Sequence, residues 1–304
     1  MTKVDDNNTL MGVSIIIVNY NTRDLLEQCV ESVFLHTTDI HFEIIIVDNA
    51  SSDGSTEMIK RNFPYVILIE SKENLGFGRA NNLGAKHANG KYLFLLNSDT
   101  ILIENSIKLL YDYFENNTND KLALIGCKLL DINKNPHISY GNFPTIKQEL
   151  FEYGLSKIFK KYYLKNLSPS VSDNSNRLRE VDYLMGADLF FKKKIFEEIG
   201  GFDEDFFLYY EETEICYRLK AKGYQILWVP ITSIIHYIGA SGNQTNTFNY
   251  WIFEQLQKSK FLYYTKCYGK SRAYLVKYIS FPKTMLVNRK QNGLRILKIL
   301  IQIH

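Results

Sequence analysis

The sequence predicts an α/β fold in which a mostly parallel central sheet is flanked by helices. Within the first 120 residues, four short apolar runs rich in β-branched side chains alternate with helix-like stretches. Each run is apolar almost without interruption, which is typical of strands covered on both faces. Strands that alternate with helices pair in parallel through crossover connections. The four runs are VSIIIVNY (13–20), FEIIIVDN (42–49), YVILIES (65–71) and KYLFLLNSD (91–99).

Helical periodicity fills the intervals between these strands. The segment from Thr22 to Phe34 has the apolar stripe of an amphipathic helix. This stripe consists of Leu25, Leu26, Cys29, Val30 and Val33. Three further helices are expected at 55–61, 76–88 and 104–114, and another strand at ALIGCKLL (123–130).

The second half of the chain is less regular. Residues 140–180 mix aromatic, lysine and serine residues without a clear period. Regularity returns at VDYLMGADLFFKK (181–193), and a short helix then ends at Gly200-Gly201. The segment YEETEICYRLKAKG predicts a helix closed by Gly223, and QILWVP and SIIHY predict two final strands.

Composition narrows the classes of function. The four cysteines have no CxxC spacing, which disfavours a redox or metal-thiolate motif and indicates reduced thiols in a cytosolic protein. The first eleven residues lack an apolar core segment, and no run approaches the ~20 apolar residues that a membrane span needs. The formal net charge of +3 favours no particular partner. We expect a cytoplasmic protein without a nucleic-acid ligand.

Polar side chains follow three of the predicted strands. Asp48 and Asp99 stand at two strand ends, and Asn19 and Asn21 follow the first strand. In open α/β sheets, ligands bind outside the carboxyl ends of the strands. The loop NYNTRD has no glycine, and GFGRAN lacks the third glycine of the dinucleotide fingerprint. The pattern therefore indicates a ligand site but disfavours a nicotinamide or flavin enzyme.

Asp99 has two interpretations. It is either the cap or a turn residue before the helix near Glu104, or a ligand of Mg²⁺ or Mn²⁺ together with Asn97. Two side chains that are two residues apart on an extended chain project in the same direction, and these cations prefer oxygen ligands. His236, after an apolar strand, is either structural or a further metal ligand. Asp48 either starts the turn DNASSDG or accepts a nucleobase N–H, and both roles are compatible.

Three acids, Glu211, Glu212 and Glu214, open the helix that follows the glycine-led aromatic loop GGFDEDFFLYY. Acidic side chains at a helix start are favoured by the helix dipole. A carboxylate in this position could instead act as a general base on an acceptor hydroxyl. The sequence leaves both readings open.

The segment from Trp251 onward differs in charge from the rest of the chain. It holds eleven Lys or Arg residues and one acid, Glu254, so its charge of +10 leaves −7 for the remainder. One reading is a pair of helices that cover the catalytic domain. The other is an anionic membrane surface as the partner of residues 251–304, because basic and aromatic side chains favour that interface. The aromatic residues concerned are Phe261, Tyr263, Tyr264, Tyr268, Tyr274 and Tyr278.

Seven motifs in this order resemble the inverting family 2 glycosyltransferases of the GT-A fold, and among them the bacterial rhamnosyltransferase-like branch. They are VSIIIVNYN, IIIVDNASSDGS, NLGFGRANNLGA, FLLNSD, GADLFFKK, IGGFDEDFFLYYEETEICYR and HYIGASG. The resemblance implies an N-terminal tail (1–11), a GT-A catalytic domain (12–242) and a basic, aromatic helical C-terminal region (243–304).

The resemblance also implies roles for individual residues. Asp48 matches the residue that reads the pyrimidine base, with Asn19, Asn21 and Asn82 nearby. Asn97-Ser98-Asp99 matches the DxD position, with Asn in place of the first Asp, so that metal binding falls on Asp99. Glu212 matches the catalytic base, which is usually an Asp in an acidic pair, and Glu211 is its neighbour in that pair. His236 matches a histidine that some members place on the metal.

The resemblance implies the transfer of rhamnose or a similar hexose from a dTDP- or UDP-sugar, with Mg²⁺ or Mn²⁺ as cofactor. The acceptor is expected to be a hydroxyl of a cell-surface glycan or of a lipid-linked glycan at the inner face of the membrane. Two alternatives remain. A sugar-phosphate nucleotidyltransferase would need a glycine- and arginine-rich loop after the first strand, where this chain has NYNTRD. A non-catalytic glycan- or membrane-binding protein could keep the fold.

Overall fold

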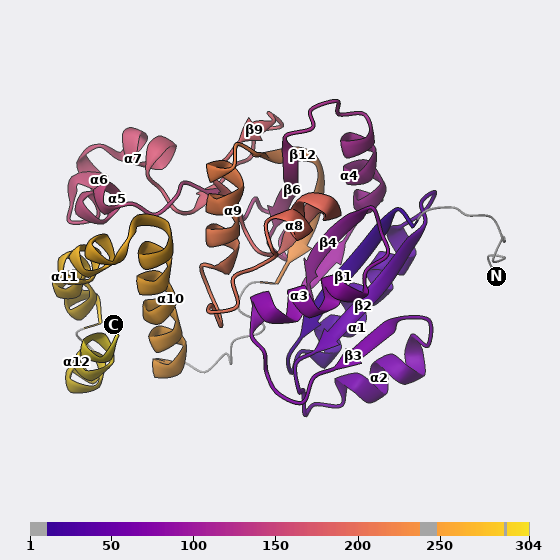
Figure 1. Cartoon of the computed structure of the whole chain (residues 1–304), viewed down its shortest axis with the longest axis horizontal. Helices are drawn as coiled ribbons and strands as arrows, with labels where there is room; N and C mark the ends of the chain where they lie inside the picture. Colours follow the sequence, from indigo (N-terminus) through magenta and orange to yellow (C-terminus); the bar gives the residue numbers. More distant parts are fainter. Residues whose placement is uncertain (1–10, 238–247, 289–290, 304) are drawn as a thin grey trace.

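A mixed nine-stranded sheet forms the centre of the molecule, with helices on both faces (Figure 1). The computed structural model describes residues 11–237, 248–288 and 291–303. On one face of the sheet lie α1 (Arg23–His36), α2 (Ser55–Asn62) and α4 (Ser106–Glu115), and on the other lie α3 (Phe77–His87), α8 (Lys193–Glu198) and α9 (Glu211–Ala221). This arrangement confirms the predicted α/β fold.

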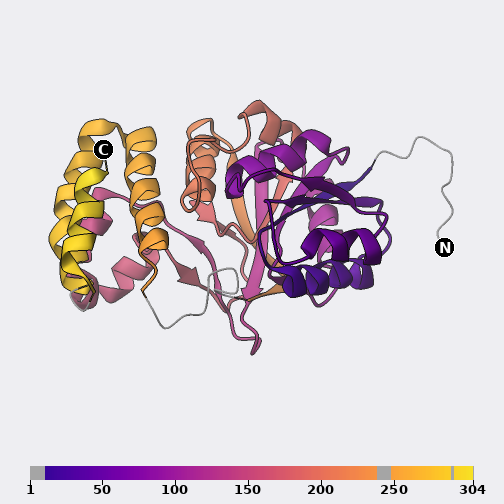
Figure 2. The ribbon, with the colours of Figure 1, turned by 90° about the horizontal axis from the view of Figure 1, so that it is seen from below.

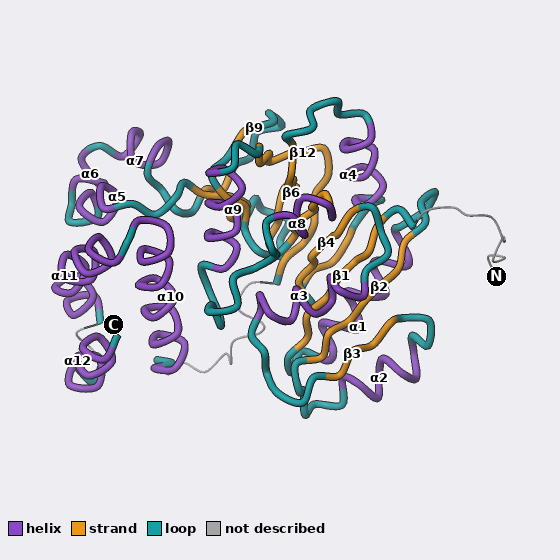
Figure 3. The backbone as a smooth tube through the Cα atoms, in the orientation of Figure 1, coloured by secondary structure: helices purple, strands orange, loops and turns teal. Residues whose placement is uncertain are grey.

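The strands of the amino-terminal half are parallel, as their continuous apolar runs predict. The order is β3 (Ile67–Glu70), β2 (Phe42–Asp48), β1 (Val13–Asn19) and β4 (Tyr92–Asn97). Beyond β4 the sheet continues with β11 (Asp188–Lys192), which is antiparallel to β4 and to β6 (Leu122–Leu130). The carboxyl ends of β1, β2 and β4 therefore meet at one edge of the sheet (Figure 3).

The last strand corrects one prediction. QILWVP and SIIHY belong to a single strand, β12 (Gln225–His236), which runs parallel to β6. Its register shifts between Trp228 and Ser233, on either side of Pro230, so the strand passes the proline through an irregularity rather than ending there. Two short strands, β5 (Thr100–Leu102) and β9 (Arg179–Glu180), pair antiparallel with β12.

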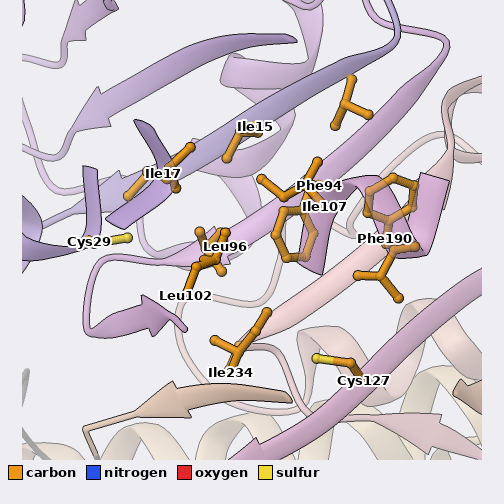
Figure 4. Packing of buried hydrophobic residues seen from close by; sticks show 14 of the residues in the cluster. Ile15, Ile17, Cys29, Phe94, Leu96, Leu102, Ile107, Cys127, Phe190 and Ile234 are labelled. Carbon is orange, nitrogen blue, oxygen red and sulfur yellow. The ribbon is translucent and has the colours of Figure 1, made fainter. Parts of the chain in front are cut away.

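Two apolar clusters hold the helices against the two faces of the sheet. One joins Ile15 and Ile17 of β1 with Cys29 of α1 and reaches Phe190 of β11 (Figure 4). The other joins Ile16 with helices α8 and α9 through Phe196 and Ile215. Successive residues of β1 belong to different clusters because strand side chains alternate between faces. This double coverage explains why the sequence of β1 shows no polar alternation.

The irregular segment at 140–180 forms a small sheet and three short helices. The sheet comprises β7 (Ile138–Gly141), β8 (Val171–Ser172) and β10 (Tyr183–Leu184). The helices are α5 (Ile146–Phe151), α6 (Leu155–Ile158) and α7 (Lys160–Asn166). Together with the carboxyl-terminal helices they form a separate lobe at one end of the molecule (Figure 2).

The carboxyl-terminal region is helical, as predicted. It comprises α10 (Tyr250–Tyr268), α11 (Lys270–Val287) and α12 (Gly293–Gln302). Tyr263 and Tyr264 are fully buried in a cluster with Phe206, which precedes α9. The expected boundary at 242/243 falls outside the described residues. No helix in the part of the chain that the structure describes is both long enough and apolar enough to cross a membrane.

Three lysines of this region form ion pairs with carboxylates elsewhere in the chain. Lys260 Nζ lies 2.6 Å from Glu149 Oε1 on α5, and Lys283 pairs with Glu152. Lys266 Nζ lies 2.8 Å from Asp203 Oδ2 and 2.6 Å from Asp205 Oδ2. These contacts and the buried tyrosines favour the reading of α10 and α11 as helices that cover the rest of the protein.

Candidate active site

One hydrogen-bond network joins the carboxyl ends of β1, β2 and β4. Asn19 Nδ2 donates to Asp48 Oδ1 at 2.8 Å, and Thr22 Oγ1 donates to Asn19 Oδ1 at 2.7 Å. Thr22 Oγ1 also lies 2.9 Å from Ser98 Oγ. Asn19 pairs with Asp48 in the register of β1 and β2, which brings the two side chains together. The structure thus unites three of the predicted site residues, Asn19, Asp48 and Ser98.

Asp48 also holds the turn that follows its strand. Its Oδ2 accepts a hydrogen bond from Ser51 N at 2.9 Å, and the residue is only 2% exposed. The turn role expected from DNASSDG is therefore present. A carboxylate has about four lone-pair sites, so these two bonds leave acceptor capacity for a ligand N–H.

Asn21 and Asn82 have structural partners. Asn21, at φ 54°, accepts a hydrogen bond from Ser52 N at 2.8 Å, which ties the loop after β1 to the loop after β2. Asn82 Nδ2 donates to Phe202 O, and Asn82 Oδ1 accepts from Phe202 N, both at 2.9 Å. Asn82 therefore fastens α3 to the loop that leads into α9. Its predicted place near the donor stays a prediction.

A close backbone approach holds the same loop at the start of α3. Gly76 has φ 79°, and a Cβ there would lie 2.1 Å from Phe207 O. Phe77 N donates to Phe207 O at 3.1 Å. Only glycine fits this left-handed, crowded position. The glycine of GFGRAN thus brings the aromatic loop before α9 against the amino-terminal end of α3.

Asp99 and His236 form the candidate metal pair. His236 Nε2 lies 3.3 Å from Asp99 Oδ1, and both side chains are largely buried. The pairing of β5 with β12 places Thr100 opposite His236, and Tyr237 N donates to Asp99 O at 2.8 Å. Asp99 is a turn residue, as one reading of the sequence expected, but it is not a helix cap, because α4 begins at Ser106 and its cap residue is Asn105.

The geometric reason given for Asn97 is also wrong. Residues 98 and 99 form a turn between β4 and β5, so the chain from Asn97 to Asp99 is not extended. The main-chain oxygen of Asn97 accepts from Thr100 Oγ1 at 2.7 Å within that turn. Asp99 therefore contacts His236, which lies on a strand distant in sequence. The expected partner, the neighbouring Asn97, is not the residue in contact.

The residues present fit a hard divalent cation with open positions. A carboxylate oxygen and an imidazole nitrogen 3.3 Å apart are close enough to bind the same ion. Within residues 11–237, 248–288 and 291–303 there is no group of three His, Cys, Asp or Glu side chains that could hold a metal. Such a protein site supplies two ligands and leaves the remaining positions to water or phosphate oxygens, as Mg²⁺ sites commonly do.

The three carboxylates in the first turn of α9 have different surroundings. Glu214 is nearly buried and accepts from Arg218 Nε at 2.7 Å and from Arg218 Nη2 at 2.8 Å. Arg218 in turn donates to Ile199 O and Gly201 O. Glu214 is therefore a structural residue that holds α9 against the end of α8.

Among the described residues, no basic side chain forms an ion pair with Glu211 or Glu212, unlike Arg218 with Glu214. Glu211 is buried, and its Oε2 has no hydrogen-bond partner among the described residues. Glu212 is partly accessible, and its Cβ would lie 3.8 Å from a Cβ built on Gly186. Burial, and then the charge of Glu212, raises the pKa of Glu211 to about 8, and burial raises the pKa of Glu212 to about 7. A helix start would lower both values, so desolvation outweighs the helix dipole here.

The backbone before this pair is unusual. Tyr209 and Tyr210 have φ values of 71° and 66°, the left-handed region that non-glycine residues rarely enter. Each such residue costs on the order of 1 kcal/mol or more, and strain of this kind clusters at functional sites. The two tyrosines turn the chain sharply into α9. Nothing in the motif YYEETEICYR signalled this conformation.

A family model matches little more than a third of the chain, and individual relatives match about three quarters of it. Residues 14–124 match the family model described as Glycosyl transferase family 2. The low-salt glycan biosynthesis hexosyltransferase Agl10 of Haloferax volcanii is 27% identical over 231 residues, which are 75% of this chain and 67% of that protein. The rhamnosyltransferase WbbL of Escherichia coli is 27% identical over 74% of this chain and 83% of its own length.

A third relative is the N-acetylglucosaminyl-diphospho-decaprenol L-rhamnosyltransferase of Mycobacterium tuberculosis. It is 24% identical over 238 residues, which are 73% of this chain and 75% of that protein. Another match, the O-antigen biosynthesis protein RfbC of Myxococcus xanthus, is 25% identical, and only 17% of its length is aligned.

Solved structures share the fold. GalNAc-T7 with UDP, GalNAc and Mn²⁺ has a TM-score of 0.58 at 16% identity, over 86% of this chain and 51% of that one. The mannosyltransferase PcManGT of Pyrobaculum calidifontis, in complex with GDP-Man and Mn²⁺, has a TM-score of 0.54 at 14% identity, over 96% of this chain and 79% of that one. At these identities the likeness concerns the arrangement of strands and helices alone.

Proposed function

The chain is a glycosyltransferase with a family 2 domain and the GT-A fold, and from this premise we propose an inverting transfer of rhamnose or a similar hexose from a nucleotide diphosphate. The observation that carries the proposal is the contact between Asp99 and His236. It lies beside the network of Asn19, Asp48 and Ser98, where β1, β2 and β4 end. A sheet edge with two candidate ligands for a cation, and with buried amide and carboxylate groups, suits a nucleotide diphosphate.

The nucleoside end of the donor binds at Asp48. The carboxylate accepts an N–H of a pyrimidine base, while Asn19 fixes its orientation through the 2.8 Å hydrogen bond. A dTDP- or UDP-sugar meets this requirement. Two relatives are named rhamnosyltransferases, and this supports rhamnose as the transferred sugar.

The diphosphate lies at Asp99 and His236. These two side chains would hold Mg²⁺ or Mn²⁺, and Mn²⁺ accompanies the nucleotide in two neighbours of the same fold. When bound, such an ion neutralises charge on the departing diphosphate. Asn97 and Ser98, in the strand end and turn before Asp99, line the same edge of the sheet.

The proton of the acceptor hydroxyl passes to Glu212. Its carboxylate is partly accessible, and its raised pKa, about 7, makes it a stronger base than an ordinary glutamate. The freed oxygen attacks the anomeric carbon from the face opposite the diphosphate, through a transition state with oxocarbenium character. One displacement inverts the configuration. Glu211 is the alternative base, and its burial makes contact with an acceptor less direct.

The acceptor is a hydroxyl of a cell-surface glycan or of a lipid-linked glycan. The name of the mycobacterial relative, which includes a diphospho-decaprenol, supports a lipid-linked acceptor at the inner face of the cell membrane. In this proposal the enzyme works in the cytoplasm, at the membrane surface.

A donor screen tests the proposal. Unfolding temperature is measured with dTDP-, UDP- and GDP-sugars, with and without Mn²⁺. A bound donor in excess raises stability with the logarithm of its concentration over its dissociation constant. We expect the largest shift with a pyrimidine nucleotide sugar and Mn²⁺ together. No shift with any nucleotide sugar would contradict the proposal and favour a non-catalytic protein that kept the fold.

A further inference from the structure

The helices α6 and α7 lie in a stretch of the chain without acidic residues. Residues 153–172 contain four lysines and neither Asp nor Glu. Neither helix has a buried residue. The lysines are Lys157, Lys160, Lys161 and Lys165, and all four are exposed. This segment therefore carries four positive charges on one short, outward-facing part of the fold.

The same helices expose large apolar side chains. Ile158 is 73% exposed and Phe159 is 53% exposed. The exposed apolar residues of this segment are Leu155, Ile158, Phe159, Tyr162 and Leu164. We call these five residues and the four lysines the α6–α7 patch. An exposed helix that only contacts water gains nothing from isoleucine, phenylalanine and leucine at such positions.

Charge compensation distinguishes this patch from α10. The three lysines of α10, Lys258, Lys260 and Lys266, each contact a carboxylate. None of the four patch lysines contacts a carboxylate of the described residues. Glu149 of α5 and Glu152, which follows that helix, are already paired. Unlike the lysines of α10, all four lysines of α6 and α7 thus lack a carboxylate partner among the described residues.

In Figure 1 the helices α6 and α7 lie beside α5 at the upper left, above α11. The chain that leads into this part of the lobe contacts α9 and Asp182. Phe143, just before α5, packs edge-on against Tyr217 of α9 with ring centroids 5.4 Å apart, and Phe143 N donates to Asp182 Oδ2 at 2.9 Å. The helix that starts with Glu211 and Glu212 is therefore connected to the lobe that carries the patch.

We propose that the α6–α7 patch docks the protein on an anionic lipid leaflet. The lysines meet the acidic headgroups, and the aromatic and aliphatic side chains enter the interfacial layer. This assignment replaces residues 251–304 as the membrane contact. It deepens the proposed function, on which it rests, because a lipid-linked acceptor is presented at such a surface.

Sedimentation of the full chain with lipid vesicles tests the proposal. Vesicles of phosphatidylcholine alone are compared with vesicles that also contain phosphatidylglycerol. We expect binding to the anionic vesicles only, with release by added salt, because exposed charges are screened. Each lysine near an anionic surface contributes roughly fivefold to the partition, so Lys160→Glu/Lys161→Glu should reduce binding by about 25-fold or more.

A matched control carries the same charge change on another surface. Arg61 of α2 and Lys86 of α3 are exposed on helices that pack on the central sheet, and neither contacts a described carboxylate. Arg61→Glu/Lys86→Glu should bind the anionic vesicles within about twofold of the unchanged protein. A second patch variant, Ile158→Ser/Phe159→Ser, keeps all four lysines and should also weaken binding, which separates interfacial insertion from charge alone.

Three outcomes would overturn the proposal. The first is equal binding of the patch variants and the control variant, and the second is no binding to anionic vesicles. The third is a protein that elutes as a dimer which Lys160→Glu/Lys161→Glu dissociates, since a second copy would then cover the patch. The unfolding-temperature shift by nucleotide sugar is measured in parallel. It should be unchanged in Lys160→Glu/Lys161→Glu, so a failure of the donor proposal is distinguishable from a failure of membrane docking.

Discussion

His236 Nε2 lies 3.3 Å from Asp99 Oδ1, although the two residues come from opposite halves of the chain. The contact depends on β5, three residues long, which pairs antiparallel with the end of β12. Asp99 is thereby placed in a turn at the sheet edge where β1 and β2 also end. A cation at this position would therefore contact both side chains rather than Asp99 alone.

The first prediction concerns this pair. Asp99→Ala should weaken Mn²⁺-dependent donor binding by at least about tenfold and abolish the stabilisation by Mn²⁺ in thermal unfolding, because the carboxylate ligand is lost. His236→Ala should show a smaller loss in the same assay. Asp120→Ala and His87→Ala, both at exposed positions, serve as controls. If Asp99→Ala kept its full response to Mn²⁺, the metal assignment would be wrong.

The second prediction concerns the base. Glu212→Gln should retain the donor-induced shift in unfolding temperature and lose sugar transfer by about 10²-fold or more, because the amide cannot accept the proton. Transfer is measured as product formed under saturating donor. Near-normal turnover in Glu212→Gln would exclude this role, and a larger loss in Glu211→Gln would move it to Glu211.

The dependence of transfer on pH gives a separate test of the same residue. The pKa of Glu212 is raised to about 7, and the base works only when ionised. Transfer at low acceptor concentration should therefore fall as the pH decreases through about 7, whereas an ordinary glutamate would stay active to about pH 4.3. Glu211 and Glu212 are adjacent, so the observed midpoint belongs to the pair. A flat profile from pH 8 to pH 5 would contradict the assignment.

Much of this arrangement was predictable from the sequence, for a physical reason. Strands β1, β2 and β4 are covered on both faces, so their sequences are apolar throughout and end abruptly in polar residues. Parallel pairing then brings Asn19 and Asp48 together, as the structure has them. The short strand β5 was missed, because three residues carry no pattern of their own and their pairing partner lies in the last strand of the sheet.

The helices within residues 140–180 were not predicted, because their sequence shows no periodicity. A helix shows periodicity when one face is buried, and α6 and α7 bury no face within the chain. Their mixture of lysine and aromatic residues thus looked irregular although they are helical. In β12, Pro230 was read as the end of a strand, while the structure accommodates it in a register shift. The inference that Asn97 and Asp99 point together assumed an extended chain where the protein makes a turn.

The third prediction concerns stability and Glu211. Burial raises the pKa of this side chain from 4.5 to about 8, so between these pH values the folded chain holds a proton that the unfolded chain releases. The contribution of Glu211 to stability is therefore present below about pH 4.5 and is lost as the pH rises toward 8. Glu211→Gln cannot ionise. The variant should exceed the unchanged protein in free energy of unfolding at pH 8.5, by about 1.4 kcal/mol for each unit of the pKa difference between the folded and unfolded chain, and should differ little at pH 4.5.

Denaturant unfolding at the two pH values measures this difference. Glu31→Gln, at an exposed position of α1, is the matched control and should show no such dependence on pH. If Glu211→Gln were less stable than the unchanged protein at pH 8.5, the carboxylate would have to be ionised and favourably bound in the folded state.

The last prediction concerns the ion pair that joins α5 to α10. Lys260 Nζ lies 2.6 Å from Glu149 Oε1, and the glutamate side chain is only 4% exposed. Tyr264 OH donates to the same oxygen at 3.4 Å. Lys260→Met would leave Glu149 buried without a cation, which costs on the order of 3 kcal/mol because a desolvated charge loses its partner. The double variant Glu149→Gln/Lys260→Met removes both charges and should recover a large part of this loss.

Lys258→Met provides the comparison, because it makes the same substitution two residues earlier on the same helix. Lys258 pairs with Glu254 at 2.6 Å, and the two side chains are 52% and 36% exposed, so this pair should contribute only a few tenths of a kcal/mol. Free energies of unfolding from denaturant titration decide between the two positions. Equal losses in Lys260→Met and Lys258→Met would mean that Glu149 reaches water when its partner is removed. A loss confined to Lys260→Met, and repaired by Glu149→Gln, would mean that α5 and α10 are held together within the lobe through a buried charge pair.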